Sequence, residues 1–346
     1  MSRSILNSLL RNHPRYLLAV KPSSVHRMVH MEKELGTDVE LWIKRDDLLK
    51  PFFGNKLRYI EYILGEYYRS GADCLVHAGG LTSNFMCSLA MIGAEFQIPV
   101  HLILTGERPS PLTGNPLLCE LFGAHVTYTK GREGTSNSSV KTQIAERLIA
   151  EGLKPFVIDY PLSNFLPYLG YINCYAEIMD QVDGGECPKP DHIILCSGWH
   201  SYLGLRIASD LIGDSTQITA IHAGYWAGSG LDQIYPQEGE FLLEKVKEFS
   251  QFLEIELPTH SFDMDDSYVG SGYGITDERC LQAMHLAAKS EGVLLDPIYS
   301  AKAMAGLIDY IHKGRFFPGD RVLFIHTGGF GNVFNYNQDI SNLLVR

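Results

Sequence analysis

The alternation of short apolar runs, rich in Val, Ile and Leu, with longer segments of helical period constrains the fold most strongly. It predicts an α/β fold with two open, mostly parallel sheets flanked by helices. The expected strands are Val39–Lys44, Cys74–Ala78, Val100–Leu104, His125–Tyr128, Pro155–Ile158, His192–Cys196, Ile218–His222 and Val322–His326. The expected helices are Leu57–Tyr68, Asn84–Phe96, Pro116–Phe122, Ser139–Ala150, Tyr168–Gln181, Leu203–Leu211, Asp277–Ser290 and Ser300–His312, and the acidic stretch Gln237–Asp266 is expected to be a helix followed by a solvated loop.

Composition excludes several classes of function. The 346 residues carry a formal net charge of -11 and no basic patch, which argues against binding a nucleic acid or a membrane surface. No segment approaches the ~20 apolar residues of a spanning helix, and polar residues interrupt the first apolar stretch, so we expect no signal peptide. The seven scattered cysteines contain no C-x-x-C pair, and the histidines form no H-E-x-x-H motif. We expect a cytoplasmic protein without a metal site.

Three expected strands end in small, flexible loops: C-L-V-H-A-G-G-L-T-S-N, H-I-I-L-C-S-G-W-H-S-Y and V-L-F-I-H-T-G-G-F-G-N. Parallel sheets bind ligands beyond the carboxyl ends of their strands. The first two loops run into helices, whose N-terminal N–H groups suit a carboxylate or phosphate, although Thr82 and Ser83 are equally suited to act as N-caps. The chain lacks the common nucleotide-binding motifs. No G-x-x-x-x-G-K-[ST] is present, and Gly228–Gln233 lacks the third glycine of G-x-G-x-x-G.

Lys56 follows a polar turn and opens a predicted helix within F-G-N-K. A helix N-terminus repels a cation, so it lowers the pKa of a lysine and favours the neutral amine that attacks aldehydes. The alternative interpretation of Lys56 is an ordinary exposed lysine.

Six motifs, in order from about Val39 to Phe334, give the chain a wider resemblance. They are I-K-R-D-D-L, F-G-N-K-L-R-Y-I-E-Y, G-G-L-T-S-N, S-G-Y-G-I-T-D-E, E-G-V-L-L-D-P-I-Y-S-A-K-A-M-A-G-L-I-D and F-I-H-T-G-G. The chain resembles the fold-type II pyridoxal-phosphate enzymes (tryptophan synthase β-like), in the group of D-cysteine desulfhydrase and 1-aminocyclopropane-1-carboxylate deaminase. The resemblance implies a large cofactor-binding domain of residues 1–55 and 160–346, a small inserted domain of residues 56–159, a homodimer, and a small amino acid as substrate.

The same resemblance implies a role for each matching residue. Lys56 matches the Schiff-base lysine, which also moves the substrate's α-proton. Asn84 matches the asparagine that binds the 3′-oxygen of pyridoxal 5'-phosphate, and Ser83 matches the loop that binds the substrate carboxylate. Tyr273 and Tyr299 match tyrosines that face the substrate side chain, although with 18 tyrosines in the chain these two are equally suited to packing. The phosphate cradle corresponds to Ser197, Gly198, Trp199, His200 and Ser201.

Ser300 falls where this group places the partner of the pyridine nitrogen. A hydroxyl there leaves the nitrogen unprotonated, which favours β-elimination, giving ammonia and a 2-oxo acid, over the opening of a cyclopropane. A second interpretation keeps the cofactor but replaces elimination by deamination, racemisation or β-replacement. A third is a non-catalytic ligand-binding protein of this fold.

The chain departs from the group in three loops. In the glycine-rich phosphate turn of the group, Trp199 and His200 replace residues that let the backbone approach the phosphate closely, which puts the tightness of cofactor binding in question. Phe85-Met86-Cys87 stands where the group has polar residues, and F-G-N-V-F replaces L-P-G-L-F after H-T-G-G. We therefore expect a substrate other than D-cysteine, bulkier or less polar.

Overall fold

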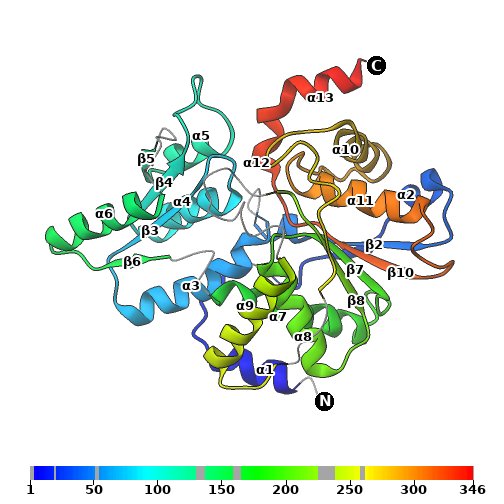
Figure 1. Cartoon of the computed structure of the whole chain (residues 1–346), viewed down its shortest axis with the longest axis horizontal. Helices are drawn as coiled ribbons and strands as arrows, with labels where there is room; N and C mark the ends of the chain where they lie inside the picture. Colours follow the sequence, from blue (N-terminus) through cyan, green and yellow to red (C-terminus); the bar gives the residue numbers. More distant parts are fainter. Residues whose placement is uncertain are drawn as a thin grey trace.

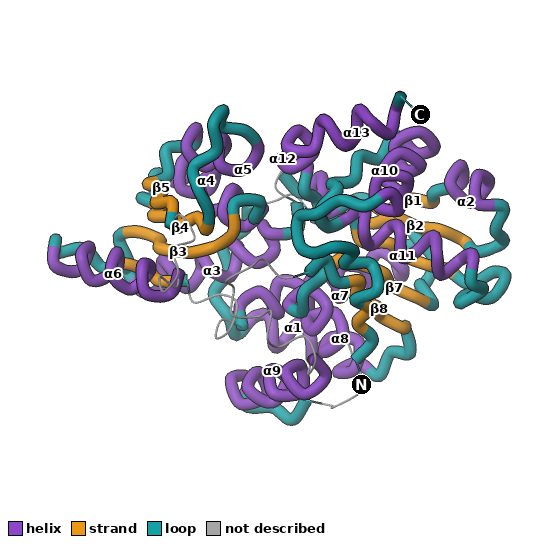
Figure 2. The backbone as a smooth tube through the Cα atoms, turned by 45° about the horizontal axis from the view of Figure 1, so that its top comes forward, coloured by secondary structure: helices purple, strands orange, loops and turns teal. Residues whose placement is uncertain are grey.

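A computed structural model shows a molecule of two lobes, each built on its own sheet (Figures 1 and 2). The structure describes residues 4–18, 21–50, 54–129, 137–158, 165–224, 238–257 and 262–345. The two mostly parallel sheets confirm the predicted α/β class. The stretch Gly228–Gln233 lies outside the described residues.

The larger sheet has six strands in the order β1-β2-β10-β7-β8-β9. Only the β1–β2 pair is antiparallel, and the other four pairs are parallel. Because β2, β10, β7 and β8 run in one direction, their carboxyl ends meet at the same edge of the sheet. The strands are β1 (Val25–Arg27), β2 (Glu40–Lys44), β7 (His192–Cys196), β8 (Gln217–Ile221), β9 (Met264–Asp265) and β10 (Arg321–Ile325).

The smaller sheet has four parallel strands in the order β5-β4-β3-β6, all within the predicted small domain. They are β3 (Cys74–Gly80), β4 (Val100–Thr105), β5 (His125–Tyr128) and β6 (Pro155–Val157). One predicted domain boundary, between residues 159 and 160, falls outside the described residues, so the domain limits stay a prediction. Helix α3 (Lys56–Ser70) runs between the two lobes and packs on α7 (Leu166–Asp183) of the larger one (Figure 1).

Helices cover both faces of each sheet. One apolar core extends from α7 and α8 through α3 and α4 to the smaller sheet, and a second lies between the larger sheet and α2, α10 and α11. The remaining bounds are α1 (Ser4–Arg11), α2 (Val29–Leu35), η1 (Asp46–Leu48), α4 (Asn84–Phe96), α5 (Gly114–Leu121), α6 (Asn137–Ala150), α8 (His200–Ile212), α9 (Glu238–Leu253), α10 (Glu278–Glu291), α11 (Ser300–His312), α12 (Phe330–Val333), η3 (Phe334–Tyr336) and α13 (Asn337–Leu344). Within the described ranges, no helix is both long and apolar enough to cross a membrane.

A buried cluster of charges ties α3 to the larger lobe. The guanidinium of Arg58, which is fully buried, forms two 2.7 Å bonds to the carboxylate of Asp46 and bonds of 3.0 and 3.1 Å to that of Glu177. Lys44 donates to the same Glu177 carboxylate over 2.7 Å. Burial raises the pKa of Glu177, but Arg58 and Lys44 outweigh it and hold that pKa well below its usual range. This cluster fixes the helix that begins at Lys56.

Candidate active site

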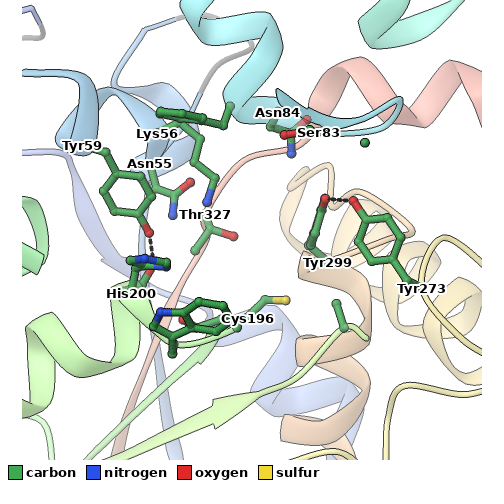
Figure 3. Close-up of a pocket in the computed structure, with 18 of the residues that line it drawn as sticks. Asn55, Lys56, Tyr59, Ser83, Asn84, Cys196, His200, Tyr273, Tyr299 and Thr327 are labelled. Atoms are coloured by element: carbon green, nitrogen blue, oxygen red, sulfur yellow. Dashed lines mark hydrogen bonds between the residues drawn. The ribbon is translucent and has the colours of Figure 1, made fainter. Parts of the chain in front are cut away.

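A cavity of about 170 Å³ lies where the carboxyl ends of β3 and β7 and the loops after β8 and β10 face one another (Figure 3). Of the predicted site residues, only Ser300 does not line the cavity. The predicted residues that do line it are Lys56, Ser83, Asn84, Ser197, Gly198, Trp199, His200, Ser201, Tyr273 and Tyr299. Tertiary structure therefore gathers, at one cavity, residues that lie up to 243 positions apart, from Lys56 to Tyr299.

Lys56 is the first residue of α3, and its amine points into the cavity (Figure 3). The turn before it presses against the loop after β10. Gly54 has φ of 63°, a Cβ on it would lie 2.4 Å from the carbonyl oxygen of Thr327, and the N–H of Asn55 donates to that oxygen over 3.1 Å. Burial lowers the pKa of Lys56 to about 8, so burial, rather than the helix end that the sequence suggested, is the main cause.

The lowered pKa predicts how the reactivity of Lys56 depends on pH. The rate of trapping by pyridoxal phosphate and cyanoborohydride should rise with an apparent pKa near 8, because the neutral amine attacks the aldehyde. At neutral pH the neutral fraction exceeds that of an ordinary lysine, with a pKa near 10.4, by about two orders of magnitude. Rates measured from about pH 6 to about pH 11 check this, and a midpoint near 10.4 would contradict it.

The start of α4 presents polar groups to the cavity. Ser83 occupies the N-cap position, but its side chain makes no capping bond, so its hydroxyl is not committed to the helix. Asn84 begins the helix, and its amide nitrogen is directed toward the cavity (Figure 3). Thr82 does not cap either: its hydroxyl donates over 3.0 Å to the hydroxyl of Tyr273. An uncapped helix N-terminus with a free serine hydroxyl suits a carboxylate.

The turn Ser197–Ser201 joins β7 to α8, which begins at His200. The Ser197 hydroxyl accepts a hydrogen bond from the N–H of Tyr202 over 3.2 Å, which stabilises the conformation of the turn. The rings of Trp199 and His200 stack 4.8 Å apart, and the Ser201 hydroxyl bonds to that of Tyr59. The turn thus keeps a helix N-terminus and hydroxyl groups at the cavity, in a setting more aromatic than a glycine-rich cradle.

Tyr273 and Tyr299 face one another with their hydroxyls in contact (Figure 3). Burial raises the pKa of Tyr273, and burial together with the neighbouring Tyr273 raises that of Tyr299 well above its ordinary value. Both phenols are therefore protonated near neutral pH. In this form their hydroxyls can donate to a substrate atom, and almost no phenolate is present to act as a base.

Ser300 does not line the cavity. It is fully buried at the start of α11, where its hydroxyl donates to Asp296 Oδ1 over 2.7 Å and accepts from the N–H of Asp296 over 2.8 Å. Burial raises the pKa of Asp296 to about 6, although bonds from Ser300 oppose the shift. The observed role of the Ser300 hydroxyl is to satisfy a buried carboxyl, and the hydroxyl-bearing residue on the cavity wall in this region is Thr327.

His222 is a cavity residue that the sequence interpretation missed. Its Nδ1 lies 3.0 Å from the N–H of Gly224 and accepts from it, so in the neutral ring the proton is on Nε2. Burial, with Lys302 nearby, lowers its pKa to about 4, which keeps the ring neutral. Only its place at the end of an expected strand signalled it. Besides small Ala and Gly residues, the other cavity residues missed are Asn55, Tyr59, His77, Cys196 and Thr327. Asn55 and Tyr59 lie close to Lys56 in the sequence, and Thr327 lies within H-T-G-G.

The donors at this cavity fit pyridoxal phosphate. A buried amine of lowered pKa suits its aldehyde, the Asn84 amide suits its ring oxygen, and the N-terminus of α8 with Ser201 suits its phosphate. No His, Cys, Asp or Glu cluster suited to a metal ion occurs within the part of the chain that the structure describes.

Comparisons with known proteins agree with this geometry. The model of the family described as "Pyridoxal-phosphate dependent enzyme" matches residues 16–328. The chain is 31% identical to the D-cysteine desulfhydrases of Serratia proteamaculans (strain 568) and Yersinia pestis, over 97% of its own length and 99% of theirs.

Solved structures give the same result. A crystallised ACC deaminase homologue superposes with a TM-score of 0.84 at 27% identity, covering 98% of each chain. The processed form of threonine deaminase isoform 2 from Solanum lycopersicum shares the fold, with a TM-score of 0.66 at 17% identity over 99% of this chain and 89% of that one. The chain belongs to the pyridoxal-phosphate dependent enzymes.

Proposed function

We propose that this enzyme is a lyase that eliminates a β-substituent from a small amino acid with an uncharged side chain, giving ammonia and a 2-oxo acid. One observation carries the proposal. Among the described residues lining the cavity, Lys56 is the only Lys or Arg, and no Asp or Glu is present. Among the described lining residues, a charged substrate side chain would find no Asp, Glu or Arg to pair with, and the pyridine nitrogen would meet a hydroxyl rather than a carboxylate.

Each residue near the substrate would have a separate role in the reaction. Bound pyridoxal phosphate supplies an electron sink for the substrate's α-carbon. Lys56 would hold its aldehyde carbon and, once displaced by substrate, accept the α-proton at Nζ. The Ser83 hydroxyl and the N-terminus of α4 would bind the substrate carboxylate. Tyr273 and Tyr299, both protonated, would donate a proton to the departing β-substituent.

The rest of the site would hold the cofactor. Asn84 would donate to the ring oxygen, and Ser201 with the α8 N-terminus would bind the phosphate. Thr327, rather than Ser300, would place a hydroxyl near the ring nitrogen, because only Thr327 reaches the cavity wall. A hydroxyl there withdraws less charge than a carboxylate, which suits elimination of a good leaving group.

The expected preference for a less polar substrate rests on Phe85. Of the three altered residues after Asn84, only Phe85 lines the cavity; Met86 packs on Gly79, and Cys87 lies against Cys119. Phe85 packs edge-on against His77 with ring centres 5.0 Å apart. The relatives are named D-cysteine desulfhydrases, so D-cysteine is the reference against which this preference is measured.

A panel of D- and L-amino acids tests the proposed function. We expect ammonia and a 2-oxo acid in equal amounts from amino acids with a leaving group on the β-carbon, and kcat/KM above that of D-cysteine for a less polar β-substituent. Enzyme that is loaded with pyridoxal phosphate but forms no 2-oxo acid from any of them would overturn the elimination. If D-cysteine is clearly the best substrate, the proposed preference for a less polar substrate is wrong, but the elimination reaction still stands.

We also propose a cytoplasmic homodimer, the usual state of the family. All seven cysteines are buried free thiols, as expected in a reducing compartment. Light scattering on the purified enzyme should give about twice the 38.7 kDa of one chain, and a value near 38.7 kDa would contradict the dimer.

A further inference from the structure

We infer that Asn332 is a positioning residue that sets the orientation of the Asn84 amide and, through it, the binding of the cofactor's ring oxygen. The inference rests on the proposed function only in taking Asn84 as a cofactor ligand. Asn332 lies in α12, directly after H-T-G-G, in the F-G-N-V segment that departs from the related group.

Two asparagines hold the same pair of acceptors. The Nδ2 of Asn332 donates to the carbonyl oxygen of Thr82 and to Oδ1 of Asn84, both over 3.1 Å. The Nδ2 of Asn115, on α5, donates to the same two oxygens over 2.9 Å each. Both N–H groups of each amide are therefore used.

This pattern determines which way the amides face. The carbonyl oxygen of Thr82 can only accept, so Asn115 and Asn332 must turn their nitrogens toward it. The atom of Asn84 that meets these two nitrogens must then be its oxygen. The Asn84 nitrogen is left on the opposite side, directed toward the cavity, as Figure 3 shows. The bonds from Asn115 and Asn332 to Oδ1 of Asn84 thus hold its amide nitrogen toward the cofactor.

The burial of Asn332 supports a positioning role. Its side chain is fully buried, and its own Oδ1 is buried without a hydrogen-bond partner within the described parts of the chain. An unsatisfied buried acceptor is unfavourable. The favourable contribution of Asn332 therefore comes from the two hydrogen bonds that its Nδ2 donates. Asn115 belongs to the smaller lobe and Asn332 to the segment after β10, so both lobes must be in place for the full set of bonds.

The variant Asn332→Asp tests the inference, because it keeps the shape but replaces the donating nitrogen by an oxygen. The new oxygen repels the Thr82 carbonyl and Oδ1 of Asn84, so the Asn84 amide is still held by Asn115 but no longer by Asn332. We expect pyridoxal phosphate to bind about 10- to 100-fold more weakly, the range found for residues that orient a ligand-binding group. The absorption maximum of the bound cofactor should also shift.

A double-mutant cycle separates positioning from a general structural effect. If Asn332 acts through Asn84, Asn332→Asp should cause no further loss of affinity in an Asn84→Ala background. Asn342→Asp, on the exposed face of α13, makes the same change of charge and should leave affinity and spectrum unchanged. Circular dichroism checks folding, and if Asn332→Asp does not fold, Asn332→Ala enters the same cycle.

Two results would overturn the inference. One is a folded Asn332 variant with the wild-type affinity and spectrum. The other is an equal loss in the wild-type and Asn84→Ala backgrounds, which would mean that Asn332 acts independently of Asn84. Failure of the wild-type enzyme itself to bind pyridoxal phosphate would instead count against the proposed function.

Discussion

Replacing Lys56 with alanine should reduce kcat/KM by at least about 10⁴-fold, the upper end of what one acid–base residue contributes. The amine is the group at the cavity with the nucleophilic and proton-accepting character that the reaction needs, and its pKa of about 8 keeps a usable neutral fraction near neutral pH. The same substitution should remove the visible absorption that the enzyme shows when loaded with pyridoxal phosphate. Steady-state kinetics and a spectrum of the purified variant provide both measurements.

Two controls sharpen this test. Lys56→Arg keeps the positive charge but not the nucleophile, and it should be as inactive as the alanine variant. Lys33→Ala removes an exposed lysine from α2 and should leave kinetics and absorption unchanged. A Lys56→Ala enzyme that retains the absorption band and more than about a hundredth of the activity would show that another lysine carries the cofactor.

Arg58→Met should destabilise the fold by about 3–5 kcal/mol, the usual penalty for removing one partner from a buried group of charges. Among the described residues, the substitution leaves Lys44 as the only cationic partner of the Asp46 and Glu177 carboxylates, and Lys44 donates to Glu177 but not to Asp46. Asp46 is fully buried, so water cannot replace the guanidinium without opening the structure. Urea unfolding followed by tryptophan fluorescence measures the loss.

Arg108→Ala is the matched control, because Arg108 also forms a two-pronged ion pair, with Glu120, but on the surface. That change should lower the free energy of unfolding by at most about 1 kcal/mol. Equal losses for the two variants would contradict the view that the buried cluster anchors α3. A surviving Arg58→Met enzyme should also bind cofactor more weakly, since Lys56 lies at the start of the helix that the cluster holds.

The sequence predicted the central strands well because parallel strands buried on both faces read as continuous apolar runs. His192–Cys196, in the middle of the larger sheet, begins and ends as expected, and so do the edge strand His125–Tyr128 and helices Asn84–Phe96 and Ser300–His312. Several short or exposed elements were missed. Strand β9 has two residues and helix α12 has four, too short to show a period, and α13 has no buried residues to mark an apolar face.

The candidate site residues that the structure gathers at one cavity lie in ordered motifs, and cavity residues that only tertiary structure brings in were not predicted. Ser300 has the right neighbours in sequence, but the chain turns its hydroxyl onto Asp296, a contact that spacing cannot reveal. His222 and Asn332 come from segments far from Lys56, and their roles depend on hydrogen-bond geometry. Of the departures Phe85-Met86-Cys87 and F-G-N-V-F, Phe85 lines the cavity and Asn332 bonds to Asn84 at its edge.

Chemical trapping of the bound cofactor shows directly whether Lys56 is the residue that carries it. The purified enzyme is loaded with pyridoxal phosphate, reduced with borohydride and digested, and the modified peptide is sequenced by mass spectrometry. We expect reduction to remove the visible absorption and to leave one phosphopyridoxyl group on Lys56. A group on another lysine, or no stable adduct despite saturating cofactor, would contradict it.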